Sequence, residues 1–375
     1  MANRLEEKTR RTLALAGVTI DGSAPHDIKV HNKALYRRAW GQGTLGVAES
    51  YMDGDWDSED LSEFFNRVMR AHLDKKLRNL STLWYYIRAR FANLQNKSRA
   101  FEVGEEHYDL GNDLFEAMLG KTLAYTCGYW SSPAGEAKSL DEVQEAKFDL
   151  ICRKIGLKPG QTILDVGCGW GSFLKFAAEK YGATGTGITV SKEQAALVRE
   201  RFKHLPIDIR VEDYRDTTGT FDHIVSIGMF EHVGPHNYRV YMQKMHSLLK
   251  DGGFFLLHTI GNNFSTYTTE AFLGKYIFPN GVIPSAAQIG KSFDDLFVLE
   301  DWHNFGPDYD KTVMAWFDNF NRAWPQLKQK YSARFYRMWK FYLMSCAGLF
   351  RARQTQLWQI VLSKEGVPGG YTSMR

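Results

Sequence analysis

The chain has 375 residues, of which 44% are hydrophobic and 24% are charged, and its formal net charge is +4. This composition is typical of a folded globular protein, and the length suits one large domain with a smaller one. No stretch of 18 consecutive apolar residues occurs, which excludes an ordinary transmembrane helix. We therefore expect a protein that is soluble or at most peripheral on a membrane.

The four cysteines show no C-x-x-C pairing and no metal-ligand spacing, which indicates a reduced, cytosolic protein without a metal site. The first residues carry charges of both signs, and the short apolar run at 12–20 lacks a small-residue cleavage site. No secretory signal is therefore expected. The aromatic content of 14% is high and suggests surfaces that bind apolar or flat groups.

Residues 1 to about 100 are predicted to form a small separate module. Residues 26–31 alternate like a short strand, and 33–40 and 58–73 have helical periodicity. The glycine-rich segment 41–46 between them is typical of a turn.

The next segment, residues 80–95, combines an apolar helical face with basic charge. The apolar positions are Leu80, Leu83, Trp84, Ile87, Phe91 and Leu94. Residues 75–100 contain seven basic residues and no acidic one. This pattern predicts an interfacial helix that seeks anionic lipid. An ordinary core-facing helix with a solvated basic side remains an alternative, and no nucleic-acid-binding motif accompanies the charge.

A connecting region at 104–148 and a helix over 140–155 lead to the strand 162–166, which ends in a glycine turn. Gly167, Gly169 and Gly171 follow Asp165 with the spacing G-x-G-x-G. Glycines at such a turn let a ligand approach the backbone closely. The match to the dinucleotide fingerprint G-x-G-x-x-G is only partial, so a purely structural turn stays open.

From this point strands and helices alternate, which predicts a parallel sheet with right-handed crossovers. The expected strands are 183–190, 207–213, 221–230 and 253–260, with helices at 172–181, 191–203 and 237–249. An irregular insert at 261–296 is interpreted as a lid over the site. Helices at 311–324 and 333–350 and a last strand at 357–364 complete the chain.

Polar side chains gather at the predicted strand ends, where an open sheet binds its ligands. They are Asp165, Thr189, Asp213, Tyr214, Arg215, Glu231, His232 and His258. Taken singly, Glu231 and His258 could be buried hydrogen-bonding groups, but together they favour a cleft site. Aromatic residues near the same edge, such as Tyr125 and Tyr309, suit an apolar substrate or a cation.

Residues 164–171 resemble motif I of the S-adenosylmethionine-dependent methyltransferases. Segments 125–130, 187–194, 228–234 and 347–351 resemble one branch of them, the cyclopropane-fatty-acyl-phospholipid synthases and mycolic acid cyclopropane synthases. The bacterial phospholipid enzymes match best, because 48–54 (with Ala48 for a glycine) and 106–115 also fit. The resemblance covers roughly residues 10 to 365.

The resemblance implies an α/β fold with a Rossmann-like seven-stranded methyltransferase sheet, its last strand antiparallel, and a small, mainly helical N-terminal domain. Residues 1–100 would be the lipid- or membrane-binding domain. Residues 101–375 would be the catalytic domain, with its insert at about 261–296.

The family also implies where S-adenosylmethionine binds. The donor would lie over Gly167, Cys168 and Gly169, after Asp165, with Tyr125 and Thr126 closing on it. Thr189 and Gln194 would contact the ribose and nearby groups, and Tyr214 and Arg215 would flank the adenine. Thr189 and Ser191 stand where many methyltransferases place an acidic residue.

A bicarbonate ion would serve as the general base in a pocket of Cys127, Glu231, His258, Ile260 and Tyr309. Thr126 and Gly128 flank Cys127 where relatives often have Ser and Ala. A carboxylate beside a bicarbonate requires one shared proton.

The sequence therefore predicts methylene transfer to unsaturated phospholipid acyl chains by a homodimer that is cytoplasmic and peripheral on the inner face of the membrane. A fatty-acyl or small-molecule methyltransferase that leaves a methyl product is the alternative enzyme. A non-enzymatic lipid-binding protein would require degenerate glycines or a missing base, and neither is seen.

Overall fold

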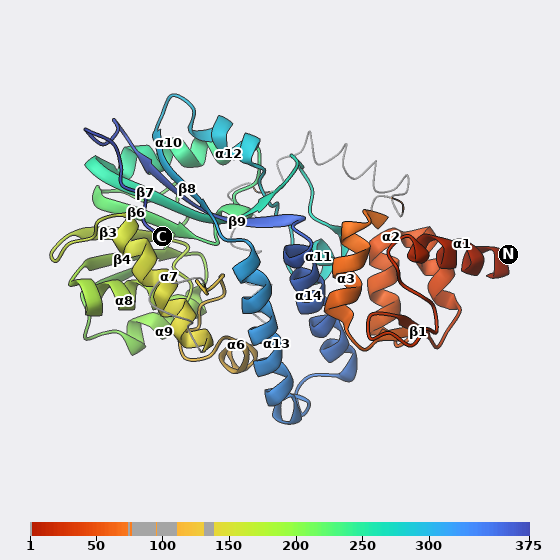
Figure 1. The fold of residues 1–375 in the computed structure, drawn as a ribbon. Helices are drawn as coiled ribbons and strands as arrows, with labels where there is room; N and C mark the ends of the chain where they lie inside the picture. Colours follow the sequence, from red (N-terminus) through yellow and green to blue (C-terminus); the bar gives the residue numbers. More distant parts are fainter. Residues whose placement is uncertain (1, 74–75, 77–94, 96–110, 131–138) are drawn as a thin grey trace. The chain divides into compact units, whose positions relative to one another are not determined.

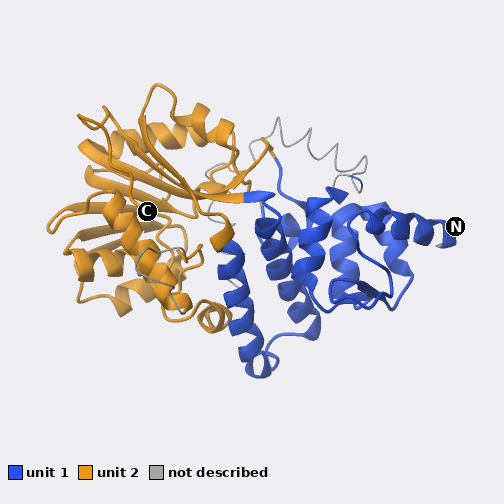
Figure 2. Cartoon of the chain, in the orientation of Figure 1, with its two compact units in different colours: residues 1–92, 268–279, 309–355 blue, residues 93–267, 280–308, 356–375 orange. Residues whose placement is uncertain are grey.

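The computed structural model describes residues 2–73, 76, 95, 111–130 and 139–375 (Figure 1). The expected amphipathic helix at 80–95 lies outside these residues except for Gln95. The chain forms two compact units (Figure 2). Unit 1 contains residues 1–92, 268–279 and 309–355, and unit 2 contains 93–267, 280–308 and 356–375.

Unit 1 is mainly helical. Its described elements are α1 (Ala2–Ala14), β1 (Ile28–Val30), α2 (Ala34–Met52), β2 (Trp56–Ser58), α3 (Leu61–Arg70), α11 (Ala271–Tyr276), most of α13 (Pro307–Leu327) and α14 (Ala333–Arg351). Helix α14 packs on α2 and α3. A Cβ added at Gly348 would lie 2.4 Å from the Cβ of Phe65, so glycine allows α14 to approach α3 closely.

Two expectations about this region differ from the structure. The predicted turn at 41–46 lies inside α2, where a positive φ of 66° at Gly43 makes a kink instead. The expected border near residue 100 does not coincide with the compact units, because α11, α13 and α14 join the N-terminal helices. Aromatic packing, such as Phe341 against Phe65 with centroids 5.0 Å apart, explains this association.

Unit 2 is built on a seven-stranded sheet. Its strands are β3 (Thr162–Val166), β4 (Thr184–Thr189), β5 (Ile207–Val211), β6 (Phe221–Ile227), β7 (Leu249–Asn262), β8 (Val298–Asn304) and β9 (Thr355–Ser363). The order is β5-β4-β3-β6-β7-β9-β8. The pairs from β5 through β7 are parallel, whereas β8 and β9 pair antiparallel. This mixed sheet confirms the predicted fold class, although β8 was not predicted.

Helices cover both faces of this sheet (Figure 1). Helices α7 (Leu140–Lys154), α8 (Ser172–Tyr181) and α9 (Lys192–Arg201) lie on one face, and α10 (Tyr238–Leu248) and α12 (Ala286–Phe293) lie on the other. A short helix, α6 (Asn112–Leu119), precedes them. Ser139, Ser191 and Ser285 begin α7, α9 and α12 by accepting a backbone N–H with the side-chain oxygen.

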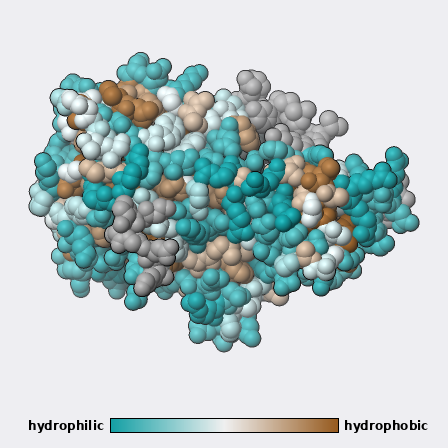
Figure 3. Space-filling view, viewed as in Figure 1, coloured by the Kyte–Doolittle hydropathy of each residue, from teal (hydrophilic) through white to brown (hydrophobic). Residues whose placement is uncertain are grey.

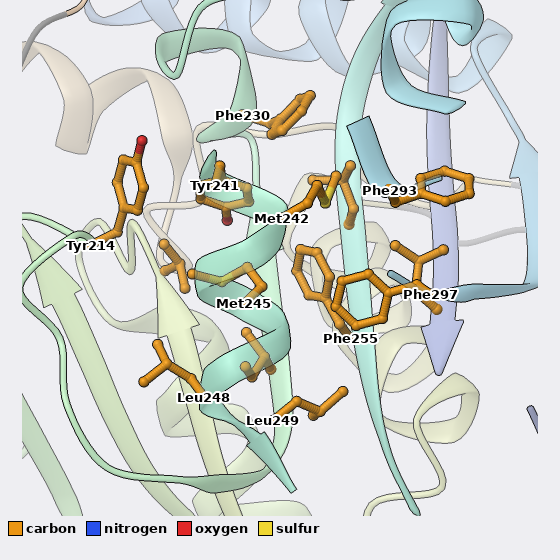
Figure 4. Packing of buried hydrophobic residues seen from close by; sticks show 14 of the residues in the cluster. Tyr214, Phe230, Tyr241, Met242, Met245, Leu248, Leu249, Phe255, Phe293 and Phe297 are labelled. Carbon is orange, nitrogen blue, oxygen red and sulfur yellow. The ribbon is translucent and has the colours of Figure 1, made fainter. Parts of the chain in front are cut away.

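The core between α10 and the sheet includes residues from the predicted insert. Tyr241, Met242 and Met245 of α10 pack near Phe255 of β7 and Phe293 of α12 (Figure 4). The prediction that 261–296 is irregular is therefore wrong for α11 and α12. Ile289 and Phe293 fall on one helical face of α12, and this face is buried in the core, with Ile289 0% exposed.

The surface carries separate apolar patches. The face in Figure 3 is largely hydrophilic, with small hydrophobic areas between polar ones. Exposed large apolar side chains include Val240 on α10 and Val298 and Leu299 on β8. Among the helices of the described residues, none is long and apolar enough to cross a bilayer.

Candidate active site

The three glycines after β3 form a turn in which Gly167 and Gly169 are half-buried and Gly171 is buried. Gly167, Gly169 and Gly171 have φ values of 83°, 53° and 74°, which favour glycine. A Cβ added at Gly169 would meet no atom within 4 Å, whereas one at Gly167 would lie 2.7 Å from Met229. The Gly169 backbone therefore faces open space, which fits the approach of S-adenosylmethionine that the resemblance implies.

Two buried polar atoms beside this turn have no hydrogen-bond partner among the described residues. They are Oδ1 of Asp165, at the end of β3, and Nε2 of Gln194 in α9. The Thr189 hydroxyl donates to Oε1 of Gln194 over 2.9 Å and so orients that amide. Buried polar groups are normally paired, so these two atoms fit a polar ligand.

Tyr214 and Arg215 follow β5 as a fixed pair. The Arg215 guanidinium lies 4.7 Å from the Tyr214 ring centroid and donates to both carboxylate oxygens of Asp213, at 3.1 and 3.0 Å. The Tyr214 ring also contacts the edge of Tyr241, with centroids 4.9 Å apart. A flat aromatic surface held in this way suits the predicted contact with adenine.

The segment of Tyr125, Thr126 and Cys127 is held beside the end of β6. A Cβ added at Gly228 would lie 2.7 Å from Cγ2 of Thr126, so glycine at this position makes room for the Thr126 side chain. The Tyr125 ring packs on Phe115 of α6, with centroids 5.4 Å apart. The Cys127 side chain is 0% exposed, and its Sγ lies 3.2 Å from the carbonyl oxygen of Gly128.

Glu231 is a buried acid that is joined to the backbone of β7. Its Oε1 accepts a hydrogen bond from the Ile260 N–H over 2.7 Å. Its Oε2 is buried and, within the described chain, has no hydrogen-bond partner. Burial raises the pKa of Glu231 to about 7, although the Ile260 N–H favours the charged form. The carboxyl group is therefore partly protonated near neutral pH.

His258 on β7 is neutral and also has an unpaired nitrogen. Its Nδ1 lies 3.3 Å from the amide nitrogen of Gln359, while its buried Nε2 has no partner in the part of the chain that the structure describes. Burial, with the charges of Lys147 and Lys154, places the pKa of His258 well below its ordinary value. The Gly228 N–H donates to the His258 carbonyl over 2.9 Å and joins the ends of β6 and β7.

Tyr309 is the one predicted pocket residue that belongs to unit 1. Its ring stacks on Phe350, with centroids 4.4 Å apart and planes 13° apart. Its predicted place beside Glu231 and His258 therefore stays a prediction. The other predicted pocket residues, Cys127, Glu231, His258 and Ile260, belong to unit 2.

Sequence reasoning missed two residues of α7 that hold the Thr126 segment. Gln144 donates to the Thr126 carbonyl over 2.7 Å, and the Lys147 ammonium donates to the Thr126 hydroxyl over 2.7 Å. Both side chains are 0% exposed. The sequence pattern could have identified them, because Gln144 and Lys147 are polar residues on the apolar helical face that includes Val143 and Ile151.

Comparisons with known proteins identify the family of this chain. The family model described as mycolic acid cyclopropane synthetase matches residues 95–360. The chain is 48% identical to the cyclopropane-fatty-acyl-phospholipid synthase of Escherichia coli strain K12, over 96% of this chain and 93% of that protein. It is 30% identical to a tuberculostearic acid methyltransferase of Mycobacterium tuberculosis, over 98% of this chain and 92% of that protein.

Among solved structures, the cyclopropane synthase MmaA2 from Mycobacterium tuberculosis is similar, with a TM-score of 0.66 and 30% identity. The likeness covers 73% of this chain and all of that one. The chain therefore belongs to the mycolic acid cyclopropane synthetase family, within the S-adenosylmethionine-dependent methyltransferases.

Proposed function

We propose that this enzyme transfers a methylene group from S-adenosylmethionine to the cis double bond of unsaturated acyl chains in membrane phospholipids, forming cyclopropane fatty acids. The observation that carries the proposal is the 48% identity to the Escherichia coli synthase, which extends over 96% of this chain. The buried acid and histidine beside the glycine turn supply side chains suited to this chemistry.

The residues of the glycine turn and of α9 would hold the donor. When it is bound, S-adenosylmethionine supplies an electrophilic methyl group. The open backbone at Gly169 and the unpaired amide nitrogen of Gln194 would bind the donor, and Tyr214 with Arg215 would orient its adenine ring. Apolar walls around the acyl chain would exclude water, which would otherwise trap the positive charge that develops on that chain.

Ring closure requires removal of a proton from the transferred methyl group, and bicarbonate is the proposed base. Oε2 of Glu231 and Nε2 of His258 are the atoms that would bind this ion, since both are buried and without partners among the described residues. The raised pKa of Glu231 lets Oε2 hold the proton that two neighbouring acids must share. Cys127, Ile260 and Tyr309 are the remaining proposed members of the pocket.

A methyltransferase that leaves a methyl branch is the second candidate. The similarity to a tuberculostearic acid methyltransferase over 98% of this chain favours it. The two reactions share the methyl transfer and differ in the step that follows it. The lipid product therefore discriminates between them.

The product test uses a bacterial host that lacks cyclopropane lipids. Expression of this chain is expected to add one methylene group to unsaturated fatty acids and to abolish the reactivity of their double bonds, as measured by mass spectrometry before and after ozonolysis. A host that expresses the Glu231→Gln variant is the control. A branched saturated product or a methylene-substituted alkene would instead support the second candidate, and unchanged lipids would contradict both.

We further propose that residues 1–100 form the lipid- or membrane-binding module and that the enzyme acts as a homodimer at the inner face of the cytoplasmic membrane. The support is the basic, apolar-striped segment of the sequence together with a substrate that lies in a bilayer. Nothing in the sequence suggests a nucleic-acid partner.

Charge reversal at Arg88 and Arg90 tests the membrane proposal. The Arg88→Glu/Arg90→Glu variant should bind vesicles of anionic phospholipid at least about 10-fold more weakly, since each basic residue contributes about 1 kcal/mol near such a surface. Its affinity for S-adenosylhomocysteine should not change. Lys180→Glu/Lys203→Glu, with two exposed lysines reversed, is the matched control. Equal vesicle binding by the two variants contradicts the proposal.

A further inference from the structure

Lys147 is a buried cation whose surroundings differ from those of a structural lysine. Its side chain is 0% exposed, and its ammonium donates to the neutral hydroxyl of Thr126. Among the described residues, no carboxylate lies within ion-pair distance of it. Its Nζ also lies 4.2 Å from the centroid of the Phe148 ring. An ammonium has three donors, and among the described residues Thr126 is its one hydrogen-bond acceptor, so a ring face and a hydroxyl leave part of its donor capacity unused.

The same helix offers a direct comparison in Lys154. This lysine is also buried, but its Nζ lies 3.3 Å from the Asp301 carboxylate and 3.2 Å from Nδ1 of His303. Arg375 adds a second cation to Asp301 at 2.7 Å. Lys154 is therefore part of a completed ion-pair network, and Lys147 is not.

The charged and polar groups around Lys147 belong to the site. Asp165 and Cys127 favour its protonated form, and its charge in turn disfavours protonation of His258. Oδ1 of Asp165 and Nε2 of His258 are both buried and lack partners within the described chain. Burial lowers the pKa of Lys147 and raises that of Asp165, so both groups are held away from full ionisation.

Lys147 also shapes the backbone beside these groups. With Gln144 it fixes Thr126 from two sides, since Gln144 binds the carbonyl and Lys147 binds the hydroxyl. Thr126 lies against Gly228 at the end of β6, and Cys127 is next in the chain. A lysine in a dry site ionises fully only when an anion accompanies it, so the place of Lys147 at this edge points to an anionic ligand.

We propose that Lys147 is a positioning residue that holds the Thr126–Cys127 segment and supplies the buried positive charge for a carboxylate-type anion at this edge of the sheet. The proposal rests on the proposed function, which brings two such anions to the site. One is bicarbonate, and the other is the carboxylate of the methionyl part of the donor. Their shared chemistry is a planar carboxylate-type group that accepts charge-assisted hydrogen bonds.

The test separates the two anions by measuring binding rather than turnover. Isothermal titration in bicarbonate-free buffer gives the Kd of S-adenosylhomocysteine for wild type and Lys147→Met. Thermal unfolding with sodium bicarbonate, against sodium chloride at equal ionic strength, reports bicarbonate binding. Lys147→Met should weaken the binding of S-adenosylhomocysteine, of bicarbonate, or of both, at least about 10-fold, as expected for loss of a charge-assisted hydrogen bond. A weaker Kd identifies the methionyl carboxylate, and loss of the bicarbonate shift identifies bicarbonate.

Two further variants keep the result interpretable. Lys154→Met removes the other buried lysine of α7, and it should lower the unfolding midpoint while both anion responses stay at wild-type values. Lys147→Gln, which retains a donor to Thr126 but no charge, replaces Lys147→Met if that variant does not fold. The inference would be overturned if a folded variant without the Lys147 charge kept both the wild-type Kd of S-adenosylhomocysteine and the wild-type shift of the unfolding midpoint with bicarbonate. An acyl product without a ring would instead contradict the proposed function, because these titrations involve no lipid.

Discussion

The Glu231→Gln variant is expected to lose about 10²- to 10⁴-fold in kcat, the range that a positioned acid–base group contributes. Glutamine retains an oxygen that can accept the Ile260 N–H, so the backbone link to β7 survives. Its amide cannot hold the shared proton at Oε2. The Kd of S-adenosylhomocysteine should stay within about 3-fold of wild type, because the donor residues are untouched. Steady-state kinetics and titration measure the two quantities, and near-normal turnover would remove Glu231 from the mechanism.

The same substitution, which should lower turnover, should raise the stability of the folded protein. The pKa of Glu231 is raised from 4.5 to about 7 in the folded protein, so unfolding releases a proton between these values. The free energy of unfolding therefore falls as pH rises through this window. Above pH 7 the wild type is fully destabilised by the ionised, buried carboxylate of Glu231. Glu231→Gln should thus be more stable than wild type at pH 8, by on the order of 2–3 kcal/mol. The difference between the two proteins should be smaller at pH 5.

Asp222→Asn is the matched control at the opposite end of β6. Asp222 accepts hydrogen bonds from the Thr162 N–H and hydroxyl at 2.8 and 2.7 Å, and with Lys250 these lower its pKa despite the cost of burial. Its contribution to stability is present above the unfolded pKa and is lost in acid, so the variant should be less stable at neutral pH. Its kcat should be that of wild type. Similar activity loss in both variants would indicate a general structural effect.

The second large effect is expected at Gly169. Gly169→Ala places a methyl group in the open space that the donor would use, so S-adenosylhomocysteine should bind about 10- to 100-fold more weakly. The left-handed φ of 53° adds about 1 kcal/mol of strain to the folded state. Calorimetric titration gives the affinity, and thermal unfolding gives the stability.

Gly160→Ala separates these two effects. Gly160 also has a left-handed φ, of 82°, and a Cβ added there would meet no atom within 4 Å, but it precedes β3 rather than follows it. The two variants should lose similar stability, and the Gly160 variant should keep its affinity for S-adenosylhomocysteine. Equal affinities in the two variants would place the donor away from the glycine turn.

The sequence by itself determined the features that depend on neighbours along the chain. The left-handed turn after β3 follows from its glycines, the starts of α7 and α9 follow from their serine caps, and the parallel pairing of β3 to β7 follows from alternating strands and helices. The polar residues of the site could be predicted because parallel strands end at one edge. Family motifs then assigned them to a methyl donor and a base.

Only the tertiary structure decided which buried groups lack partners. The Ile260 N–H occupies one oxygen of Glu231 and leaves the other unpaired, and two buried lysines of one helix differ because Asp301 reaches Lys154 and not Lys147. Likewise, α14 packs on α2 and α3, from which it is separated by hundreds of residues along the chain. These contacts join distant segments, and their burial and charge depend on packing that local periodicity does not encode.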